Sequence, residues 1–497
     1  MVGIIELFQE SVEIFAARLR ITLSITILFV ATLICLLIEK LWGAKRHKVA
    51  FLVSLLALIA AEIIIVLSPV ELLDHTKEFY VYDSFAKFFA AFGVFVTIAI
   101  VVIAQFYMKD LPEIPVFFAC ITGTAIGLIL LPAATDLIAL YIAWELLSVP
   151  LYGIVLYSYD WRKSAEGALK YFVLGAVSSA FLGLGFGLMI IVSGTSNIYL
   201  LGAALESALV NPLNKILLGV AILMLVVGFS VKITVVPFHT WAPDTYTGSA
   251  HPVTAYLSGT IKAVRFSAPL RVFILLTPLL RIDAQAYFAV LAFITMTYAN
   301  IVALKQRNIY RMMAYSSIAQ IGYALIGFVA GTIYGISAAI FYVFIFAIAE
   351  VVVFSVIGIL WRVLGIETVD ELSGFSKENA YIAIVFAFSL LSLLGLPPLA
   401  GFAGKVYLFF AALDNNLLWL GIALVINSGI SAGYYGLLVK KMFLDEPSKK
   451  IGKIKLPPQD LIALGILTLI LLIVGIYPGI IEPFARMAAQ VLFPTLG

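Results

Sequence analysis

Apolar residues fill the chain in runs of about twenty, and short polar breaks separate these runs from one end to the other. A helix of twenty residues rises about 30 Å, which is the thickness of a bilayer's hydrocarbon core. The pattern therefore predicts an all-α polytopic membrane protein with about fourteen spanning helices. The expected spans are 21–39, 49–68, 84–107, 114–132, 135–158, 168–193, 213–235, 252–276, 285–304, 312–331, 334–362, 380–396 with 401–412, 416–439 and 459–477.

The first twenty residues do not resemble a secretory signal. Glu6, Glu10 and Glu13 precede Arg18, so the segment lacks a basic start and a small-residue cleavage site. We expect it to form an interfacial helix that leads into the first span.

Composition supports a membrane protein and excludes some functions. Hydrophobic residues make up 63% of the 497 residues and charged residues 12%, whereas soluble domains average about 45–50% and 25%. The net charge of +3 gives no reason to expect a nucleic-acid partner. Cys35 and Cys120 lie in separate spans without metal-ligand or redox spacing, so we expect neither a cofactor nor a metal in this chain.

Basic residues gather in the connections that follow odd-numbered spans. They are Lys45, Arg46 and Lys48, then Arg162 and Lys163, then Lys305, Arg307 and Arg311, and finally Lys440, Lys441, Lys449, Lys450, Lys453 and Lys455. The positive-inside rule then places odd connections in the cytoplasm and both termini outside. We expect a multi-pass protein of the cell membrane.

Six of the ionisable side chains within or close to predicted spans are candidates for function. Each one at bilayer depth costs about 2.5–3.5 kcal/mol on insertion scales, so it needs a partner, a hydrated cavity or a function. The six are Glu145, Lys170, Lys232, Lys262, Glu350 and Lys405.

Two of them have polar neighbours at helical spacing. Glu145 shares a helix face with Ser148 and Tyr152. Lys170 follows Glu166 by one turn, which is also the spacing of an exposed ion pair at a helix start.

The eighth span carries a polar stripe. His251, Thr254, Ser258, Lys262 and Arg265 follow one another at intervals of three or four residues, which places them on one face of an α-helix. The stripe predicts a hydrated pathway.

Two spans combine a lysine with residues that interrupt a helix. "FSVKITVVPFHTW" carries Lys232 and Pro237, and His239 beyond them could pass protons on or be a packed interfacial histidine. "LGLPPLAGFAGKVYLF" contains Pro397, Pro398 and Lys405. Irregular backbone at membrane depth is tolerated where protein buries it or where it lines a water-filled cavity.

The interrupted spans are the seventh and the twelfth, five apart. Breaks at corresponding positions are typical of two structural repeats around an ion or substrate site. We expect inverted repeats of spans 4–8 and 9–13. The predicted organisation is 1–112 with the interfacial helix and spans 1–3, 113–276 and 285–443 with the two repeats, and 444–497 with a basic cytoplasmic loop, span 14 and a tail.

Glu350 lies in "FYVFIFAIAEVVVFSVIG" with apolar residues on every side. Either desolvation keeps it protonated, or it pairs with a lysine from another helix.

These stretches resemble one family. "WELLSVPLYGIVLYS", "SAEGALKYFVLGAVSSAFLGLG", "KITVVPFHTWAPDTYTGSAHPVTAYLSGTIKAV", "NIYRMMAYSSIAQIGYALIG" and "GLPPLAGFAGKVYLFFAAL" cover most of residues 120–415. They are similar to the proton-translocating antiporter-like subunits of respiratory complex I, above all the NADH-quinone oxidoreductase subunit N (NuoN) type. Subunits of Mrp antiporters and of membrane-bound hydrogenases share this ancestry.

The resemblance implies a charged, water-connected axis through the middle of the membrane. It assigns Glu145, Lys170, Lys232, Lys262 and Lys405 to that axis. Lys305 lies where relatives often carry a basic residue, although anchoring of its loop is an equal alternative. Relatives usually have a neutral or basic residue at Glu350, and this departure favours a hydrogenase-like, sulfur-reducing or Mrp-like setting.

The resemblance also implies partners. This chain would carry no redox chemistry and would move H⁺, or Na⁺, within a redox-driven complex of hydrophobic membrane subunits and a peripheral module whose partner subunits hold iron–sulfur clusters. Glu145 and Lys232 would act as a pair whose separation changes the lysine's affinity for a proton. The alternative is a stand-alone secondary transporter of cations or small solutes, with the broken helices around its substrate.

Overall fold

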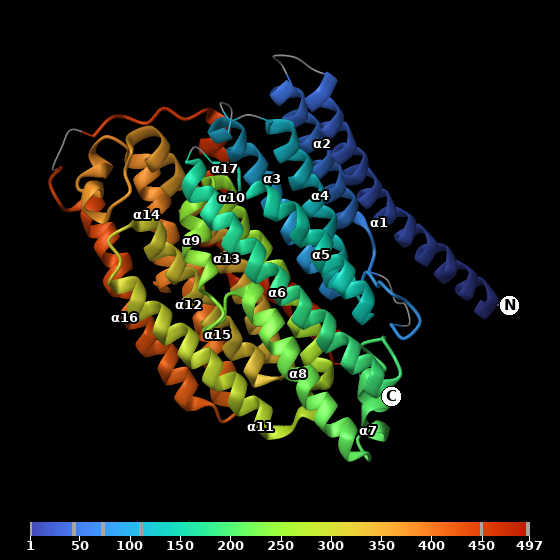
Figure 1. Ribbon diagram of the computed structural model, residues 1–497. Coiled ribbons are helices and arrows are strands. Elements are labelled where there is room, and N and C mark those ends of the chain that lie inside the picture. Colours follow the sequence, from blue (N-terminus) through green and yellow to red (C-terminus); the bar gives the residue numbers. More distant parts are fainter. Residues whose placement is uncertain are drawn as a thin grey trace.

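The computed structural model describes residues 2–41, 46–70, 75–108, 111, 113–158, 160–447 and 451–493, with side chains in these ranges except at 2–17, 41, 275 and 277–284. Throughout these ranges the regular structure is helical, and pairing between extended residues is limited to isolated bridges. The predicted all-α class is therefore confirmed. Figure 1 shows the helices running side by side as one bundle.

Twelve described helices are long and apolar enough to cross a membrane. They belong to α1 (Val2–Leu41), α2 (Arg46–Leu67), α3 (Ser84–Met108), α4 (Ile114–Ala133), α5 (Leu137–Ile154), α6 (Trp161–Ser193), α8 (Pro212–Ile233), α11 (Lys262–Leu304), α12 (Ile309–Ala330), α13 (Ile333–Leu364), α16 (Leu418–Phe443) and α17 (Pro458–Ile476). Each coincides with a predicted span. The two other predicted spans, 252–276 and 380–412, are interrupted.

The shorter elements lie at the interruptions and in the connections. They are α7 (Leu201–Ala208), α9 (Trp241–Gly248), α10 (His251–Ala255), the π-helix η1 (Tyr256–Ile261), the 3₁₀ turns η2 (Val369–Leu372), η3 (Phe375–Lys377) and η4 (Pro478–Ile480), and α14 (Ala380–Leu394), α15 (Ala400–Asp414) and α18 (Glu482–Gln490).

Polar residues fix where several spans begin. Asp136, Asn211 and Asn308 precede α5, α8 and α12, and each side chain accepts a hydrogen bond from a backbone N–H of the first turn. Asp160 does the same for α6, which therefore begins seven residues before the predicted start of that span at 168. Short polar breaks thus satisfy helix ends and separate the spans.

The predicted interfacial helix is continuous with the first span. α1 extends without interruption from Val2 to Leu41, and its apolar portion is Arg18–Lys40. In Figure 1 the N-terminal part of α1 projects away from the other helices.

Two antiparallel passes lie within α11. Phe273 and Phe288 are fifteen residues apart, a separation of about 22 Å in a straight helix, yet their ring centroids are 5.4 Å apart. The chain must therefore reverse direction between these two residues. This agrees with separate spans at 252–276 and 285–304.

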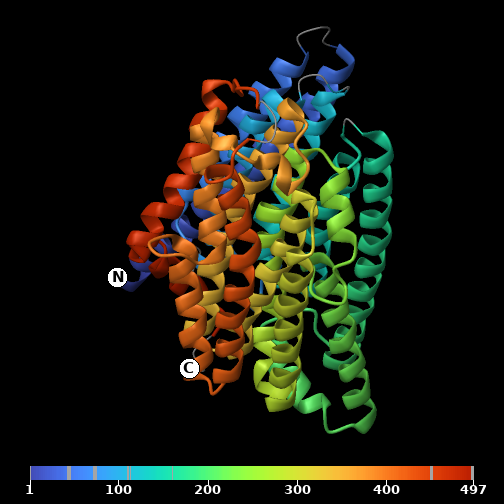
Figure 2. The ribbon, with the colours of Figure 1, turned by 90° about the vertical axis from the view of Figure 1, so that its left-hand side faces the viewer.

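α13 forms the centre of the molecule. The apolar stretch of this helix is completely buried, and the helix packs against α3, α12, α14, α15, α17 and α18. Figure 2 shows the green helices around α6 and α8 on one side and the orange and red helices on the other, with yellow ones between them. A helix shielded from lipid in this way can carry an ionisable residue such as Glu350.

Candidate functional site

The first interruption follows α8. Thr234 takes a left-handed conformation with φ of 64°, which ends α8, and helix resumes at Trp241. Pro237 lies inside this gap and has no N–H to donate. Trp241 Nε1 donates to the carbonyl of Val231 at 2.7 Å, so part of the broken helix end is satisfied by a side chain.

Lys232 occupies the last turn of α8 and is only 2% exposed. Its Nζ donates to the hydroxyl of Tyr152 at 2.6 Å and faces Ser148 Oγ at 3.4 Å, both on α5. It also lies 4.9 Å from the centroid of the Tyr152 ring. A buried ammonium at a helix C-terminus gains from the helix dipole and from these neutral oxygens.

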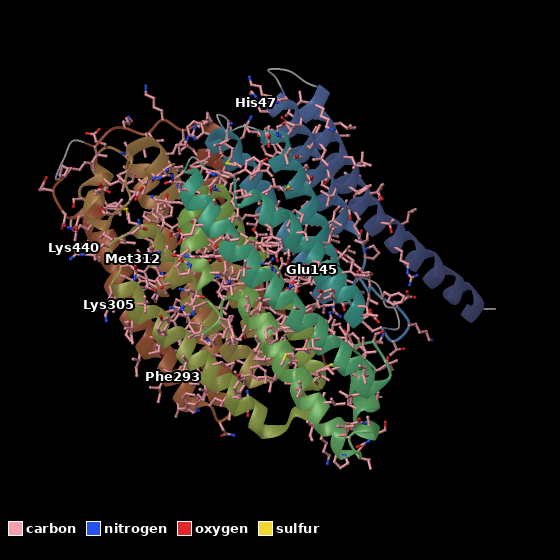
Figure 3. All side chains as sticks on the ribbon, viewed as in Figure 1. His47, Glu145, Phe293, Lys305, Met312 and Lys440 are labelled. Carbon is pink, nitrogen blue, oxygen red and sulfur yellow. The ribbon has the colours of Figure 1, made fainter. Side chains whose placement is uncertain are left out.

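Glu145 lies half-way along the bundle in Figure 3 and accepts a short hydrogen bond from Ser179 on α6. No ion pair within 4.0 Å joins Glu145 to Lys232, although both residues belong to the described part of the chain. The two groups expected to form a coupled pair are therefore separated in this structure, with Ser148 and Tyr152 beside the lysine.

Arg265 is a second buried cation at this site, and it lies only 1% exposed. Its Nη2 donates to Ser148 Oγ at 3.0 Å and to the Tyr171 hydroxyl at 3.2 Å. Ser148 is thus the oxygen between Arg265 and Lys232. The sequence placed Arg265 in the polar stripe, but its link to Ser148 joins α11 to α5 and depends on the tertiary structure.

The polar stripe of the eighth span does not lie on one uniform α-helix. The chain between His251 and Lys262 passes from α10 through the π-helix η1. His251 Nε2 is 2.8 Å from the Tyr310 hydroxyl, and its Nδ1 has no partner among the described residues. Ser258 makes a local contact of 3.5 Å with the carbonyl of Ala255. The wider π turns change the spacing on which the expected continuous stripe depended.

Lys262 and Glu350 share one serine. Lys262 Nζ makes a short hydrogen bond with Ser317 Oγ, which in turn donates to Glu350 Oε2 at 2.8 Å. Both charged residues are 1% exposed, and Glu350 Oε1 lacks a hydrogen-bond partner within the described ranges. The structure thus places Glu350 near a lysine of another helix but separates the two groups by a hydroxyl.

The second interruption lies between α14 and α15. Gly395, with φ of 87°, ends α14, and Pro397 and Pro398 occupy the gap. Lys405 on α15 reaches back to donate to the carbonyl of Leu394 at 2.7 Å. Its Nζ lies 4.6 Å from the centroid of the Tyr323 ring, and the residue is 5% exposed.

Neutral polar side chains fill the region near Lys262 and Lys405. Gln320 accepts a short hydrogen bond from Tyr342 and donates to the Tyr435 hydroxyl at 2.9 Å. Asn300 donates to the Tyr323 hydroxyl at 2.9 Å. No pattern along the chain groups these residues, because they come from α11, α12, α13 and α16.

Lys170 has a different setting from the buried lysines. It is 40% exposed and pairs with Glu166 at 2.6 Å, as the surface alternative expects. It also pairs at 2.6 Å with Asp244 on α9, and Asp244 pairs with Arg311 of α12 at 2.7 Å. Asp244 thus connects α6, α9 and α12.

The two remaining candidates differ in their surroundings. His239 is buried in the first gap, its Nδ1 meets no partner in the described part of the chain, and its ring lies edge-on to Tyr298. Lys305 is exposed at the end of α11 and lies at the edge of the molecule in Figure 3.

A buried ion pair lies in the eighth span nine residues beyond Lys262, towards the end of that span. Arg271 Nη2 lies 2.9 Å from Asp83 Oδ2, and both side chains are almost fully buried. His75 Nε2 is 3.1 Å from the same oxygen. Burial raises the pKa of Asp83, but the Arg271 guanidinium and His75 outweigh it and hold that pKa below its ordinary value.

Sequence reasoning missed several buried carboxylates, among them Asp83 and Asp460. Asp460, in the first turn of α17, has 0% exposure, and neither carboxylate oxygen has a hydrogen-bond partner among the residues that the structure describes. It follows two prolines in a polar stretch, which is typical of an ordinary helix start. As for metals, no group of three His, Cys, Asp or Glu residues is placed to hold one within the described ranges.

Comparison with known sequences identifies relatives over most of the chain. It is 33% identical to NADH-quinone oxidoreductase subunit N of Moorella thermoacetica over 377 residues, which cover 76% of this chain and 78% of that one. It is also 33% identical to F(420)H(2) dehydrogenase subunit N of Methanosarcina mazei over 423 residues, covering 83% and 85%.

Solved structures share the fold. A chain of respiratory complex I from Thermus thermophilus with bound aureothin superposes with a TM-score of 0.76 at 26% identity, covering 93% of this chain and 99% of that chain. A chain of the membrane-bound sulfane sulfur reductase, an archaeal respiratory membrane complex, gives 0.84 at 21% identity, covering 95% and 97%.

The family model described as NADH:quinone oxidoreductase/Mrp antiporter, transmembrane, matches residues 134–431. This range contains both broken helices and the buried Lys232, Lys262 and Lys405. Together with the relatives above, the match shows that the chain belongs to the NADH:quinone oxidoreductase/Mrp antiporter family.

Proposed function

We propose that this chain is the ion-translocating, antiporter-like membrane subunit of a redox-driven complex. Relatives are named as subunits of NADH-quinone oxidoreductase and of F(420)H(2) dehydrogenase, and similar chains come from complex I and the sulfane sulfur reductase. The partners would be other hydrophobic subunits and a peripheral redox module that holds the iron–sulfur clusters.

One observation carries the proposal. Lys232, Lys262 and Lys405 are buried at membrane depth, and no described carboxylate lies within 4.0 Å of any of their ammonium groups. Their nearest partners are hydroxyls and one carbonyl. A purely structural lysine at this depth normally pairs with a carboxylate, whereas a lysine with neutral partners can bind and release a proton.

The proposed route has two parts. Lys232, with Ser148 and Tyr152, belongs to the first, and proton release from it would follow separation from Glu145. The first part connects to the second through Lys262, Ser317 and Glu350. In the second part, Lys405 would exchange protons with one membrane face. His239 at the first break and Ser258, one turn before Lys262, would add polar groups to this route, and His251 would lie where a polar pocket with Ser158 and Asp160 opens at its end.

Lys170 and Lys305 have more peripheral roles in this scheme. Lys170 would couple the route to Asp244 and thereby to α12. The exposure of Lys305 supports loop anchoring. The breaks at Pro237 and at Pro397 and Pro398 would supply the backbone groups that attract water.

The repeat organisation is part of the proposal. Helix, break and short helix follow one another in α8 and α9, and again in α14 and α15. This recurrence supports inverted repeats at 113–276 and 285–443, with 1–112 and 444–497 outside them. The positive-inside pattern supports termini on the outer face of the cell membrane.

The decisive experiment uses the complete complex reconstituted in vesicles. Lys232→Ala should abolish coupled ion transport, whereas Lys215→Ala, an exposed lysine on the same helix, should leave it unchanged. Intact transport in Lys232→Ala would rule out the scheme. Transport by the chain alone would favour a stand-alone secondary transporter.

The ion is identified by varying sodium. H⁺ transport predicts acidification at equal rates with and without Na⁺, and a protonophore should collapse it. Na⁺ transport predicts uptake of ²²Na⁺ that survives the protonophore. Co-purification of partner subunits with iron–sulfur signals would identify the parent complex.

A further inference from the structure

A groove on the side of the molecule lies between α2, α3, α13 and α18, away from the buried lysines. Its volume is about 410 Å³. This falls in the range of ligand-binding pockets, about 300–1000 Å³. The residues that define its polar end and its apolar floor are Glu62, Ser84, Lys87, Phe92, Phe95 and Phe344.

The groove is about one leaflet deep. Along α3 it runs from Ser84, the first residue of the helix, to Phe95. Eleven residues of helix rise about 16.5 Å, roughly half of a 30 Å hydrocarbon core. Its polar residues lie at the helix ends near the membrane surface, and its aromatic residues lie deeper.

Glu62 presents an unsatisfied carboxylate to this groove. Its Oε2 is buried and has no hydrogen-bond partner in the described part of the chain, although the residue lies on a membrane-spanning helix. Lys87 is the other charged residue among the described lining residues. Its ammonium and the Glu62 carboxyl group do not form an ion pair within 4.0 Å. A buried carboxyl oxygen without a hydrogen bond is costly, so a donor from outside the chain would stabilise it.

Lys87 supplies the complementary charge. Its Nζ donates to the carbonyl of Ser68 at 2.7 Å. An ammonium has three donors, so this bond leaves two for another acceptor. The groove therefore offers one acceptor and one cation close to the surface, above an apolar channel.

The lining favours a charged headgroup above hydrocarbon chains. Glu62 and Lys87 supply charge at one end, and the rest of the lining is mostly aromatic and aliphatic. Hydrocarbon chains, whose carbons make contact at about 4 Å, fit this space.

We propose that the groove binds one phospholipid whose headgroup carries a primary amine. The ammonium donates to Glu62, the phosphate accepts from Lys87, and a hydrocarbon chain lies along Ala91, Phe92 and Phe95. Glu62 then gains a donor, and Lys87 gains an acceptor besides the carbonyl of Ser68. A lipid without an amine would leave Glu62 unsatisfied.

The bound chain would contact the central helix. Phe344 of α13 closes the groove, and its ring centroid lies 5.0 Å from that of Phe92. Glu350 follows on the same helix, six residues further. The lipid therefore buttresses the helix that carries the central carboxylate, independently of the ion that the protein moves.

The test uses the purified complex and two lipids with identical acyl chains, phosphatidylethanolamine and phosphatidylglycerol. Native mass spectrometry counts the molecules retained. Wild type should retain phosphatidylethanolamine in preference, and Glu62→Gln should reduce this retention about tenfold, the effect of one lost charge-assisted hydrogen bond. Ala91→Trp should exclude the lipid by filling the groove.

Leu56→Trp is the matched control, because Leu56 lies on α2 with 64% exposure and outside the groove. It should retain lipid like the wild type. Equal retention of both lipids, or unchanged retention in Glu62→Gln and Ala91→Trp, would overturn the proposal. A cysteine placed in the groove by Val66→Cys gives a further test. It should cross-link to a photoactivatable lipid, and a cross-link to a partner subunit instead would also overturn the proposal.

Discussion

Both broken helices bring a lysine ammonium to the C-terminal end of a half-helix, but they surround it differently. Lys232 lies in the last turn of α8, and Lys405 reaches back to the last turn of α14, so each cation meets the C-terminal end of a half-helix. Lys232 has hydroxyl partners and a second buried cation, Arg265, beside it. Lys405 has a backbone carbonyl and an aromatic ring.

The wider surroundings of the two breaks also differ, with charged partners in the first half and neutral partners in the second. The first half holds the buried pair Arg271–Asp83, whereas Asn300, Tyr323 and Tyr434 in the second half form a neutral hydrogen-bonded network. Two cations near one serine repel each other, so proton occupancy of Lys232 depends on its neighbours. The first break therefore holds its lysine near a second cation, whereas the second holds its lysine among neutral partners.

The largest expected effect tests the anchor of the first half. Asp83→Asn leaves Arg271 buried without its counterion and should lower the free energy of unfolding by about 3–5 kcal/mol. The pKa of Asp83 is depressed, so its stabilisation is present above about pH 3.9 and is lost as pH falls through the lower folded value.

Thermal unfolding in detergent at pH 7 measures this loss, and the variant should also be less sensitive to acid than the wild type. Asp370→Asn is the control, since that carboxylate is exposed and its pairs lie on the surface. Equal stability of wild type and Asp83→Asn would contradict the assignment of an anchoring role.

The next effect concerns both lysines. Arginine holds its proton at least about a hundredfold more tightly than lysine. Lys232→Arg and Lys405→Arg should therefore each slow ion transport by about a hundredfold while charge is preserved. Vesicle acidification measures it, and Lys215→Arg serves as the control. If only one variant is impaired, then only that half takes part in translocation.

A smaller effect separates the two sites. Lys232→Met and Lys405→Met each remove one buried ammonium, but only the second leaves a carbonyl, that of Leu394, without its donor. Lys405→Met should be less stable than Lys232→Met by about 1–3 kcal/mol. Chemical denaturation of both variants gives the difference, and equal stabilities would show that the carbonyl contact does not matter.

The smallest effect concerns the shared serine. Ser148→Ala removes the oxygen that lies between Lys232 and Arg265 and should slow transport about fivefold, equivalent to about 1 kcal/mol. Ser389→Ala in the second half, where the hydroxyl bonds to its own helix, is the matched control. Similar rates for the two variants would remove Ser148 from the route.

Periodicity was sufficient for much of the fold. The apolar runs predicted the spans that the structure describes, because a bilayer requires a continuous apolar helix of fixed length. Proline also marked both interruptions. The π-helix at Tyr256–Ile261 carries no comparable signal, since a π turn depends on neighbouring helices as much as on its own residues.

The cost of charge in lipid is enough to single out Glu145, Lys232, Lys262, Glu350 and Lys405. That cost depends on residue type and depth alone, so the sequence by itself determined which residues need an explanation. Only the tertiary structure decided their partners, because Ser148, Ser317 and the Leu394 carbonyl belong to other helices or to a helix end. Contacts between helices depend on packing, which periodicity along one chain does not encode.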